Sequence, residues 1–318
     1  MRRSLAAAAL ALAVAAAPAA ARPPSTSYAS PSWAPDGREL AYVSARGPAG
    51  SVLLSGADGM NQRLLTRAKV LFQVAWSPRG DRVAYATNGR VFVIGRDGRG
   101  KVQVGLGAEL AWSPDGSRLA FAATNGGIAA VGADGSGYVS LTNGRYDHAP
   151  AWAPDGRRIA FAHAVGAGAD GRLFVVSRDG GGARPLGLQG AAPAWSPDGT
   201  ELAFWRVTSD GVALAVASAD GSSERTLTRS LAAFSGVPRW SPSGRELLFS
   251  PCSGSGFCRI DVAAADGSYV TRLGGGSDPA WAPDGERIAF VNRRGCWGAS
   301  VFLMNLETRR VSRLTRCR

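Results

Sequence analysis

Short apolar stretches with a period of two recur along the chain. In residues 119–122 and 159–161, large side chains alternate with alanine, and successive side chains of a β-strand point to opposite faces of its sheet. Such strands present large residues on one face and small residues on the other. The pattern therefore predicts sheets that neighbouring sheets bury on both faces. Residues 222–235 lack Gly and Pro and predict one helical turn instead.

Seven copies of one phrase divide the chain into similar units. The phrase is Trp-Ser/Ala-Pro-Asp-Gly, with Arg79 and Ser243 in place of Asp in two copies. The copies begin 36 to 45 residues apart, at Trp33, Trp76, Trp112, Trp152, Trp195, Trp240 and Trp281. Each unit contains four strand-like stretches, and repeated four-stranded units of about 40 residues are typical of β-propellers. The sequence therefore predicts an all-β, seven-bladed β-propeller of four-stranded antiparallel blades, with the seven indoles in its core.

Two kinds of turn join the strands of a unit. In Pro-Asp-Gly, Pro fixes φ, Asp caps the turn and Gly adopts a positive φ. Six units carry a second hairpin signal, Asp-Gly, at Asp58, Asp97, Asp134, Asp179, Asp220 and Asp266. The seventh unit has Glu307 and Thr308 at this place. Because eleven of the 24 acidic residues lie in these turns, few carboxylates remain for an acid–base pair or a cation site.

The first 21 residues have the features of a secretory signal peptide. Arg2 and Arg3 precede an apolar run over residues 5–17, and three alanines end the segment, which predicts cleavage before Arg22. The run is too short to span a bilayer, and no later segment reads as transmembrane. We therefore expect a signal peptide over 1–21, a short lead-in over 22–27 and a propeller over 28–318. The expected location is extracytoplasmic, periplasmic or secreted, and both the Sec and the twin-Arg routes stay open.

The chain is strongly basic, with a formal net charge of +12. Of its 36 basic residues only Lys69 and Lys101 are lysines. An Arg-rich exported protein favours anionic partners such as a wall polymer or an acidic envelope protein; the alternative is an ordinary solvated surface. The export signal argues against nucleic acid, and we expect a monomer.

The repeated phrase also carries a family resemblance. The order Pro-x-Trp-Ser-Pro-Asp-Gly-x-x-Ile/Leu-Ala-Phe, then an apolar strand, Asp-Gly and Arg-Leu-Thr, resembles the WD-like repeats of the TolB family propeller. The lead-ins at Asp147–Pro150 and Asp278–Pro279 are similar to those of the family. The resemblance implies an extracytoplasmic propeller that binds other proteins without catalysis. TolB itself has six blades and a preceding α/β domain, whereas this chain has seven repeats and no segment that reads as such a domain.

The sequence offers no obvious catalytic centre. There is no G-x-S-x-G nucleophile elbow and no P-loop, and the only histidines are His148 and His163, which read as loop or interior residues. We therefore expect a protein that is not an enzyme, with no catalytic residue, metal or cofactor. The alternative is a propeller enzyme, a polysaccharide lyase or hydrolase, with its site in the central channel.

All four cysteines fall in the last two repeats. Cys252 and Cys258 bracket one loop, Cys296 lies in the matching loop of the next unit, and Cys317 is next to last in the chain. Four cysteines permit three pairings; pairing within each unit favours Cys252–Cys258 and Cys296–Cys317. The second bridge would fasten the last strand, since no blade has strands from both ends of the chain.

The connections that vary in length predict the binding surface. Within a unit, the first and third turns are short and uniform, whereas the second-to-third connection and the link to the next unit vary. Binding residues usually lie in variable loops on a rigid scaffold, and aromatic and Arg residues are common interface anchors; the alternative is loop packing and solvated charge. The candidates are Arg46, Arg145, Tyr146, His148, Trp205, Arg206, Phe234, Arg293, Arg294 and Trp297.

Overall fold

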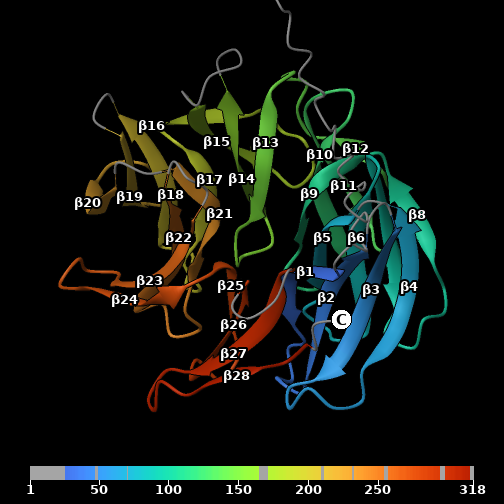
Figure 1. The fold of residues 1–318 in the computed structure, drawn as a ribbon. Helices are drawn as coiled ribbons and strands as arrows, with labels where there is room; N and C mark the ends of the chain where they lie inside the picture. Colours follow the sequence, from blue (N-terminus) through green and yellow to red (C-terminus); the bar gives the residue numbers. More distant parts are fainter. Residues whose placement is uncertain are drawn as a thin grey trace, which may run out of the picture.

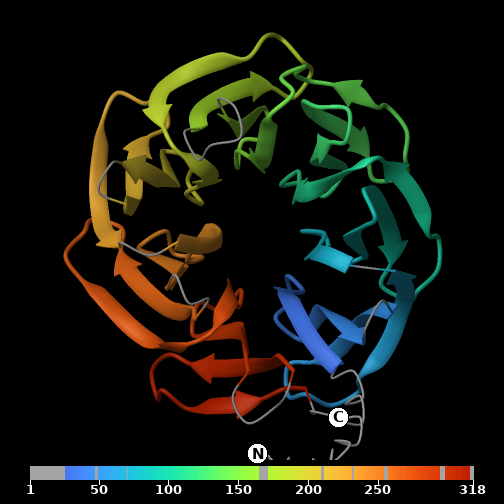
Figure 2. The same ribbon diagram turned by 45° about the horizontal axis from the view of Figure 1, so that its top comes forward.

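The computed structural model describes residues 26–46, 49–69, 71–164, 171–208, 211–230, 233–253, 257–293 and 298–315. Within these ranges all regular structure is β: 28 strands form seven antiparallel four-stranded sheets (Figure 1). The sheets are arranged as a ring of blades (Figure 2), which confirms the predicted seven-bladed propeller. The helical turn expected within 222–235 is wrong, because β20 and β21 occupy most of that stretch. No helix able to cross a membrane occurs in the described ranges.

Every blade is one continuous stretch of chain, with its first strand next to the axis and its fourth outside. Blades 1 to 4 consist of β1 (Thr26–Trp33), β2 (Glu39–Arg46), β3 (Ala49–Gly56), β4 (Arg63–Lys69); β5 (Leu71–Trp76), β6 (Arg82–Thr87), β7 (Arg90–Gly95), β8 (Val102–Gly105); β9 (Gly107–Trp112), β10 (Arg118–Ala123), β11 (Ile128–Gly132), β12 (Val139–Ser140); and β13 (Asp147–Trp152), β14 (Arg158–Ala164), β15 (Gly171–Ser177), β16 (Arg184–Gln189). Blades 5 to 7 consist of β17 (Ala191–Trp195), β18 (Glu201–Thr208), β19 (Gly211–Ser218), β20 (Glu224–Ser230); β21 (Ala233–Trp240), β22 (Glu246–Cys252), β23 (Arg259–Ala264), β24 (Val270–Gly275); and β25 (Ser277–Trp281), β26 (Arg287–Asn292), β27 (Ser300–Asn305), β28 (Val311–Arg313).

The first strand begins earlier than the sequence suggested. β1 starts at Thr26, inside the stretch 22–27 that was expected to be a lead-in, and pairs with the far end of β2 at Arg46. The signal peptide and its cleavage site lie outside the described residues and stay predictions.

The repeated turns have the chemistry expected of them. The Gly37 N–H donates to the carbonyl of Ala34 over 2.9 Å, Gly37 has a φ of +67°, and the Asp36 carboxylate accepts from the Arg38 N–H over 2.9 Å. In blade 3 the Ser113 hydroxyl, together with the backbone and hydroxyl of Ser117, lowers the pKa of Asp115 to about 2. These local bonds set the uniform geometry of the turns.

Large and small side chains alternate between blades as predicted. Leu119 and Phe121 of β10 are fully buried and pack with Ala84 and Ala86 of blade 2. Ala120, on the opposite face of β10, packs in the cluster formed with blade 4. Each face of a blade is therefore buried by a neighbour, which explains the alternation in the sequence.

The repeat tryptophans join adjacent blades. The Trp112 Nε1–H donates to the carbonyl of Ala75 in the preceding blade over 3.1 Å, and the indoles at positions 33, 195, 240 and 281 make the equivalent bond. The Nε1 atoms of Trp76 and Trp152 are buried without a partner among the described residues. The core position predicted for the indoles is confirmed: four are buried and three are half-buried.

Blades 7 and 1 lie side by side and close the ring (Figure 2). The Trp33 Nε1–H donates to the carbonyl of Ala280 over 3.3 Å. The Arg287 guanidinium lies 5.0 Å from the centre of the Trp33 ring and donates to the carbonyl of Gly37 over 3.4 Å. Cys296 and Cys317 lie outside the described residues, so their bridge stays a prediction.

Candidate binding face

The two ends of the strands give the ring two different faces. The hairpins between first and second strands and between third and fourth strands lie on one face, which we call the turn face. The connections between second and third strands, and from one blade to the next, lie on the other, which we call the loop face. The predicted binding residues belong to the loop face.

A cationic and aromatic cluster lies on the loop face at the entry to blade 4. The Arg145 guanidinium is 5.8 Å from the centre of the Tyr146 ring, and Tyr146 is 44% exposed. The imidazole Nδ1 of His148 is 3.0 Å from the carbonyl oxygen of Tyr146. The structure therefore brings three of the predicted residues together on one loop.

A buried carboxylate holds this loop in place. The Asp147 side chain is 4% exposed and accepts hydrogen bonds from the Thr142 hydroxyl and from the Gly144 N–H over 3.1 Å. Its other oxygen is 2.6 Å from Nδ1 of His163, whose ring meets Phe174 edge-on at 5.9 Å. Sequence reasoning noted Asp147 only as a lead-in and did not pair it with His163. The pair explains why Tyr146 and its neighbours have a fixed position.

Trp205 is internal rather than on the loop surface, and its contact with a partner stays a prediction. It is 2% exposed, its Nε1–H donates to the carbonyl of Gly236 over 2.9 Å, and its ring stacks on Phe234 at 4.8 Å. The physical reason is that β18 extends to residue 208, which places Trp205 inside a strand and against blade 6. Phe234 is half-buried by the same contact.

The remaining predicted residues are more dispersed. Arg206 pairs with Glu224 over 2.9 Å and keeps 42% of its side chain exposed, and Arg46 and Arg293 are exposed. Arg294 and Trp297 lie outside the described residues.

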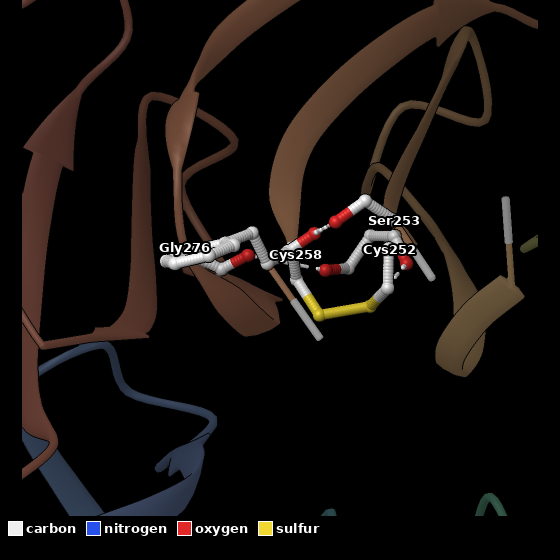
Figure 3. The surroundings of a disulfide bond; sticks show 6 residues. Cys252, Ser253, Cys258 and Gly276 are labelled. Carbon is white, nitrogen blue, oxygen red and sulfur yellow. Dashed lines mark hydrogen bonds between the residues drawn. A yellow bond between two sulfur atoms is a disulfide. The ribbon is translucent and has the colours of Figure 1, made fainter. Parts of the chain in front are cut away.

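A disulfide fixes an exposed aromatic residue that the sequence reading missed. Cys252 and Cys258 are bonded (Figure 3), as one of the two favoured pairings predicted. Between them, Phe257 is 79% exposed, and its carbonyl accepts from the N–H and the hydroxyl of Ser253 over 2.8 and 3.2 Å. The Cys258 carbonyl accepts from the Gly276 N–H over 3.0 Å. A large apolar residue inside a short cysteine loop was the available signal.

Polar side chains of the innermost strands accept hydrogen bonds from backbone N–H groups of the next blade. Gln73 accepts from the Leu110 N–H over 2.8 Å, and Glu109 accepts from the Ala149 N–H over 2.5 Å. Burial raises the pKa of Asp278, and a hydrogen bond from the Ser30 N–H opposes that effect. Within the described ranges, no group of three or more His, Cys, Asp or Glu residues is placed to hold a metal ion.

The turn face carries a cleft of about 510 Å³ with mixed charge. It is lined by Arg79, Arg82 and Arg118 together with Asp81 and Asp134. The Arg79 guanidinium donates to the carbonyl of Asp115 over 2.6 Å, and Arg118 donates to the carbonyl of Arg178 over 3.1 Å. Two of the three arginines thus donate hydrogen bonds to backbone carbonyls of the protein itself.

Comparisons with known proteins agree with this architecture. Residues 183–318 match the family model described as the TolB beta propeller domain. No curated protein matches the chain in sequence. Among solved structures, a putative TolB from Agrobacterium tumefaciens is 21% identical with a TM-score of 0.59, covering 71% of this chain and 91% of its own.

Two similar structures are enzymes. An oligogalacturonate lyase in complex with manganese is 15% identical with a TM-score of 0.72, covering 88% of this chain and 90% of its own. A puromycin-hydrolyzing peptidase from Mycobacterium tuberculosis is 17% identical with a TM-score of 0.70, covering 91% of this chain and 53% of its own. At these identities the likeness concerns the fold.

Proposed function

We propose that this protein is an exported, non-catalytic β-propeller that binds a protein or an anionic polymer of the cell envelope through its loop face. The observation that carries the proposal is the cluster of the exposed Arg145 and Tyr146 with the half-buried His148, at the point where the loop enters β13 and Asp147 anchors it. A prepositioned aromatic and cationic surface loses little entropy when a partner binds, and Tyr and Arg are enriched among interface anchors. The match to the TolB propeller domain supports a binding role, and the signal-like segment 1–21 supports export.

The test is an unbiased pulldown from envelope extract with the mature protein as bait. The loop-face variant Arg145→Ala/Tyr146→Ala is compared with Arg157→Ala/Tyr138→Ala, which removes an exposed Arg and a 51% exposed Tyr from the turn face. We expect the specific partner to be lost only with the loop-face variant. Equal retention by both variants would overturn the assignment of the binding face.

The alternative is a propeller enzyme acting on a polysaccharide, and the likeness to an oligogalacturonate lyase favours testing it. The same purified protein is incubated with acidic and neutral glycans, with and without added manganese, and the products are separated by size. Shortened chains that depend on the protein would overturn the non-catalytic proposal.

A further inference from the structure

The only two lysines of the chain lie in one cleft. Lys69 is the last residue of β4 in blade 1, and Lys101 directly precedes β8 in blade 2. Both line a cleft of about 340 Å³ between these blades. Arg67 and Arg90 line the same cleft, and the other lining residues are uncharged. Four cations therefore surround one concavity whose lining contains no carboxylate.

The fold places these cations by ordinary strand geometry. Along β4, Leu65 is buried in the cluster shared with blade 2 and Ala68 packs against that cluster. Arg67 and Lys69, on either side of Ala68, are exposed and line the cleft. On the other wall, Asn88 and Gly89 have φ values of +47° and +67° and form a two-residue hairpin turn, after which Arg90 begins β7.

Two contacts fix the walls in advance of any ligand. The Thr87 hydroxyl donates to the carbonyl of Lys69 and thereby joins the ends of β6 and β4. Phe92 stacks on the buried Tyr85 with ring centres 5.3 Å apart, and the Lys101 ammonium lies 4.8 Å from the centre of the Phe92 ring. The cleft is therefore preorganised, which reduces the entropy cost of binding.

Some cations of the molecule are neutralised by a nearby carboxylate, whereas, within the described ranges, the four cleft cations are not. Arg225 pairs with Glu201 over 2.6 Å and Arg96 with Glu39 over 2.9 Å. Among the described residues, no carboxylate lies within ion-pair distance of any of the four cleft cations. No carboxylate in that part of the chain offsets their mutual repulsion, so an anion that enters the cleft gains attraction from all four.

We propose that this cleft binds phosphate groups of a linear polyanion, so that two or more negative charges enter together. This inference rests on the proposed function and specifies the chemistry of its polymer ligand. Phosphate has several oxygens pointing in different directions, which suits point-charge lysines on opposite walls and flanking arginines. A planar carboxylate matches a single Arg better.

The experiment uses inorganic polyphosphate as the probe, with orthophosphate and polygalacturonate for comparison, and measures affinity by calorimetry at two salt concentrations. We expect polyphosphate to bind more tightly than either at equal charge, with an affinity that falls as salt rises because bound counterions are released. Tighter binding of polygalacturonate would overturn the phosphate assignment.

Variants separate the cleft from net charge. Lys69→Gln/Lys101→Gln should weaken polyphosphate binding by about tenfold or more, a loss of about 1.4 kcal/mol, whereas Lys69→Arg/Lys101→Arg should retain most of it. Arg157→Gln/Arg310→Gln removes the same charge from exposed turn-face positions and should bind like the parent. An equal loss in this control, or full binding by the glutamine variant, would overturn the proposal.

The two lysines also provide a direct footprint. Bound polyphosphate should slow the labelling of Lys69 and Lys101 by an amine-reactive reagent, with the α-amino group as the internal reference in mass spectrometry. Unchanged labelling at saturating polyphosphate would place the ligand elsewhere. The lysine variants leave the Arg145/Tyr146 cluster intact, and the Arg145→Ala/Tyr146→Ala variant leaves the cleft intact. Calorimetry therefore tests the cleft and the pulldown tests the loop face, and either proposal can fail without the other.

Discussion

The buried carboxylate of Asp147 allows a quantitative test of how the binding loop is held. Its oxygens accept from the Thr142 hydroxyl, the Gly144 N–H and the His163 ring, and only 4% of the side chain is exposed. Asp147→Asn keeps the shape but removes the charge and replaces one acceptor oxygen with a donor. Either the Thr142 and Gly144 donors or the His163 ring then face an N–H group in place of a carboxylate oxygen. A hydrogen bond to a charged group contributes about 1.5–3 kcal/mol, and an orphaned buried group adds a desolvation cost. We therefore expect the free energy of unfolding to fall by about 2–4 kcal/mol.

The assay is urea unfolding followed by Trp fluorescence, with Asp134→Asn as the matched control. Asp134 also accepts two hydrogen bonds, from the Ser136 N–H and hydroxyl over 2.9 and 2.7 Å, but it lies in an exposed turn. There we expect a much smaller loss than at Asp147, because water replaces the missing acceptor. A double-mutant cycle with His163→Ala should show coupling between the two sites. Equal losses at Asp147 and Asp134, or no coupling, would refute the view that Asp147 holds the loop.

Three further outcomes follow from the packing and the turns. The pKa of Asp115 is lowered to about 2 from a model-peptide value of 3.8, so its stabilising effect is present above pH 4 and is lost as pH falls through about 2. The urea midpoint should therefore fall less steeply with decreasing pH in Asp115→Asn than in the parent. The same pH dependence in both proteins would contradict this. At Gly107 an added Cβ would lie 2.3 Å from a backbone oxygen, so Gly107→Ala should cost about 1–3 kcal/mol or more, whereas Gly181→Ala, whose nearest contact is at 3.5 Å, should change the thermal midpoint little. Trp112→Phe removes an indole hydrogen bond of 3.1 Å, whereas Trp76→Phe removes an Nε1 that has no partner among the described residues. We therefore expect Trp112→Phe to destabilise the protein more than Trp76→Phe by about 1 kcal/mol. The reverse order in calorimetry would argue against the indole bonds as links between blades.

The repeated phrase was sufficient to predict the fold because each of its residues acts locally or on an adjacent blade. Pro, Asp and Gly determine a turn within five residues, and the indole reaches only the preceding blade. The phrase that carries both effects recurs seven times in the sequence, so the fold is visible without a structure. The helical turn expected in 222–235 failed because pairing with β19 and β22 outweighs the absence of Gly and Pro there.

The binding surface was less predictable because its residues do not follow the repeat. Trp205 was assigned to a loop, but the length of β18 depends on pairing with β19 as far as Thr208. The four cations of the cleft come from two blades, and the two lysines among them occur nowhere else in the chain. The bond between Asp147 and His163 joins residues 16 apart through strand pairing. Such contacts depend on register and are absent from the local pattern.

Among the described strands, no sheet combines strands from both ends of the chain, so every junction between blades lies between two complete sheets. A circular permutant opened at an exposed connection between two other blades would leave all seven sheets uncut, and such exposed sites generally tolerate new termini. Duplication or loss of a whole unit would likewise change the circumference of the ring without splitting a sheet. The same topology that leaves the ring without a covalent seam thus makes it modular.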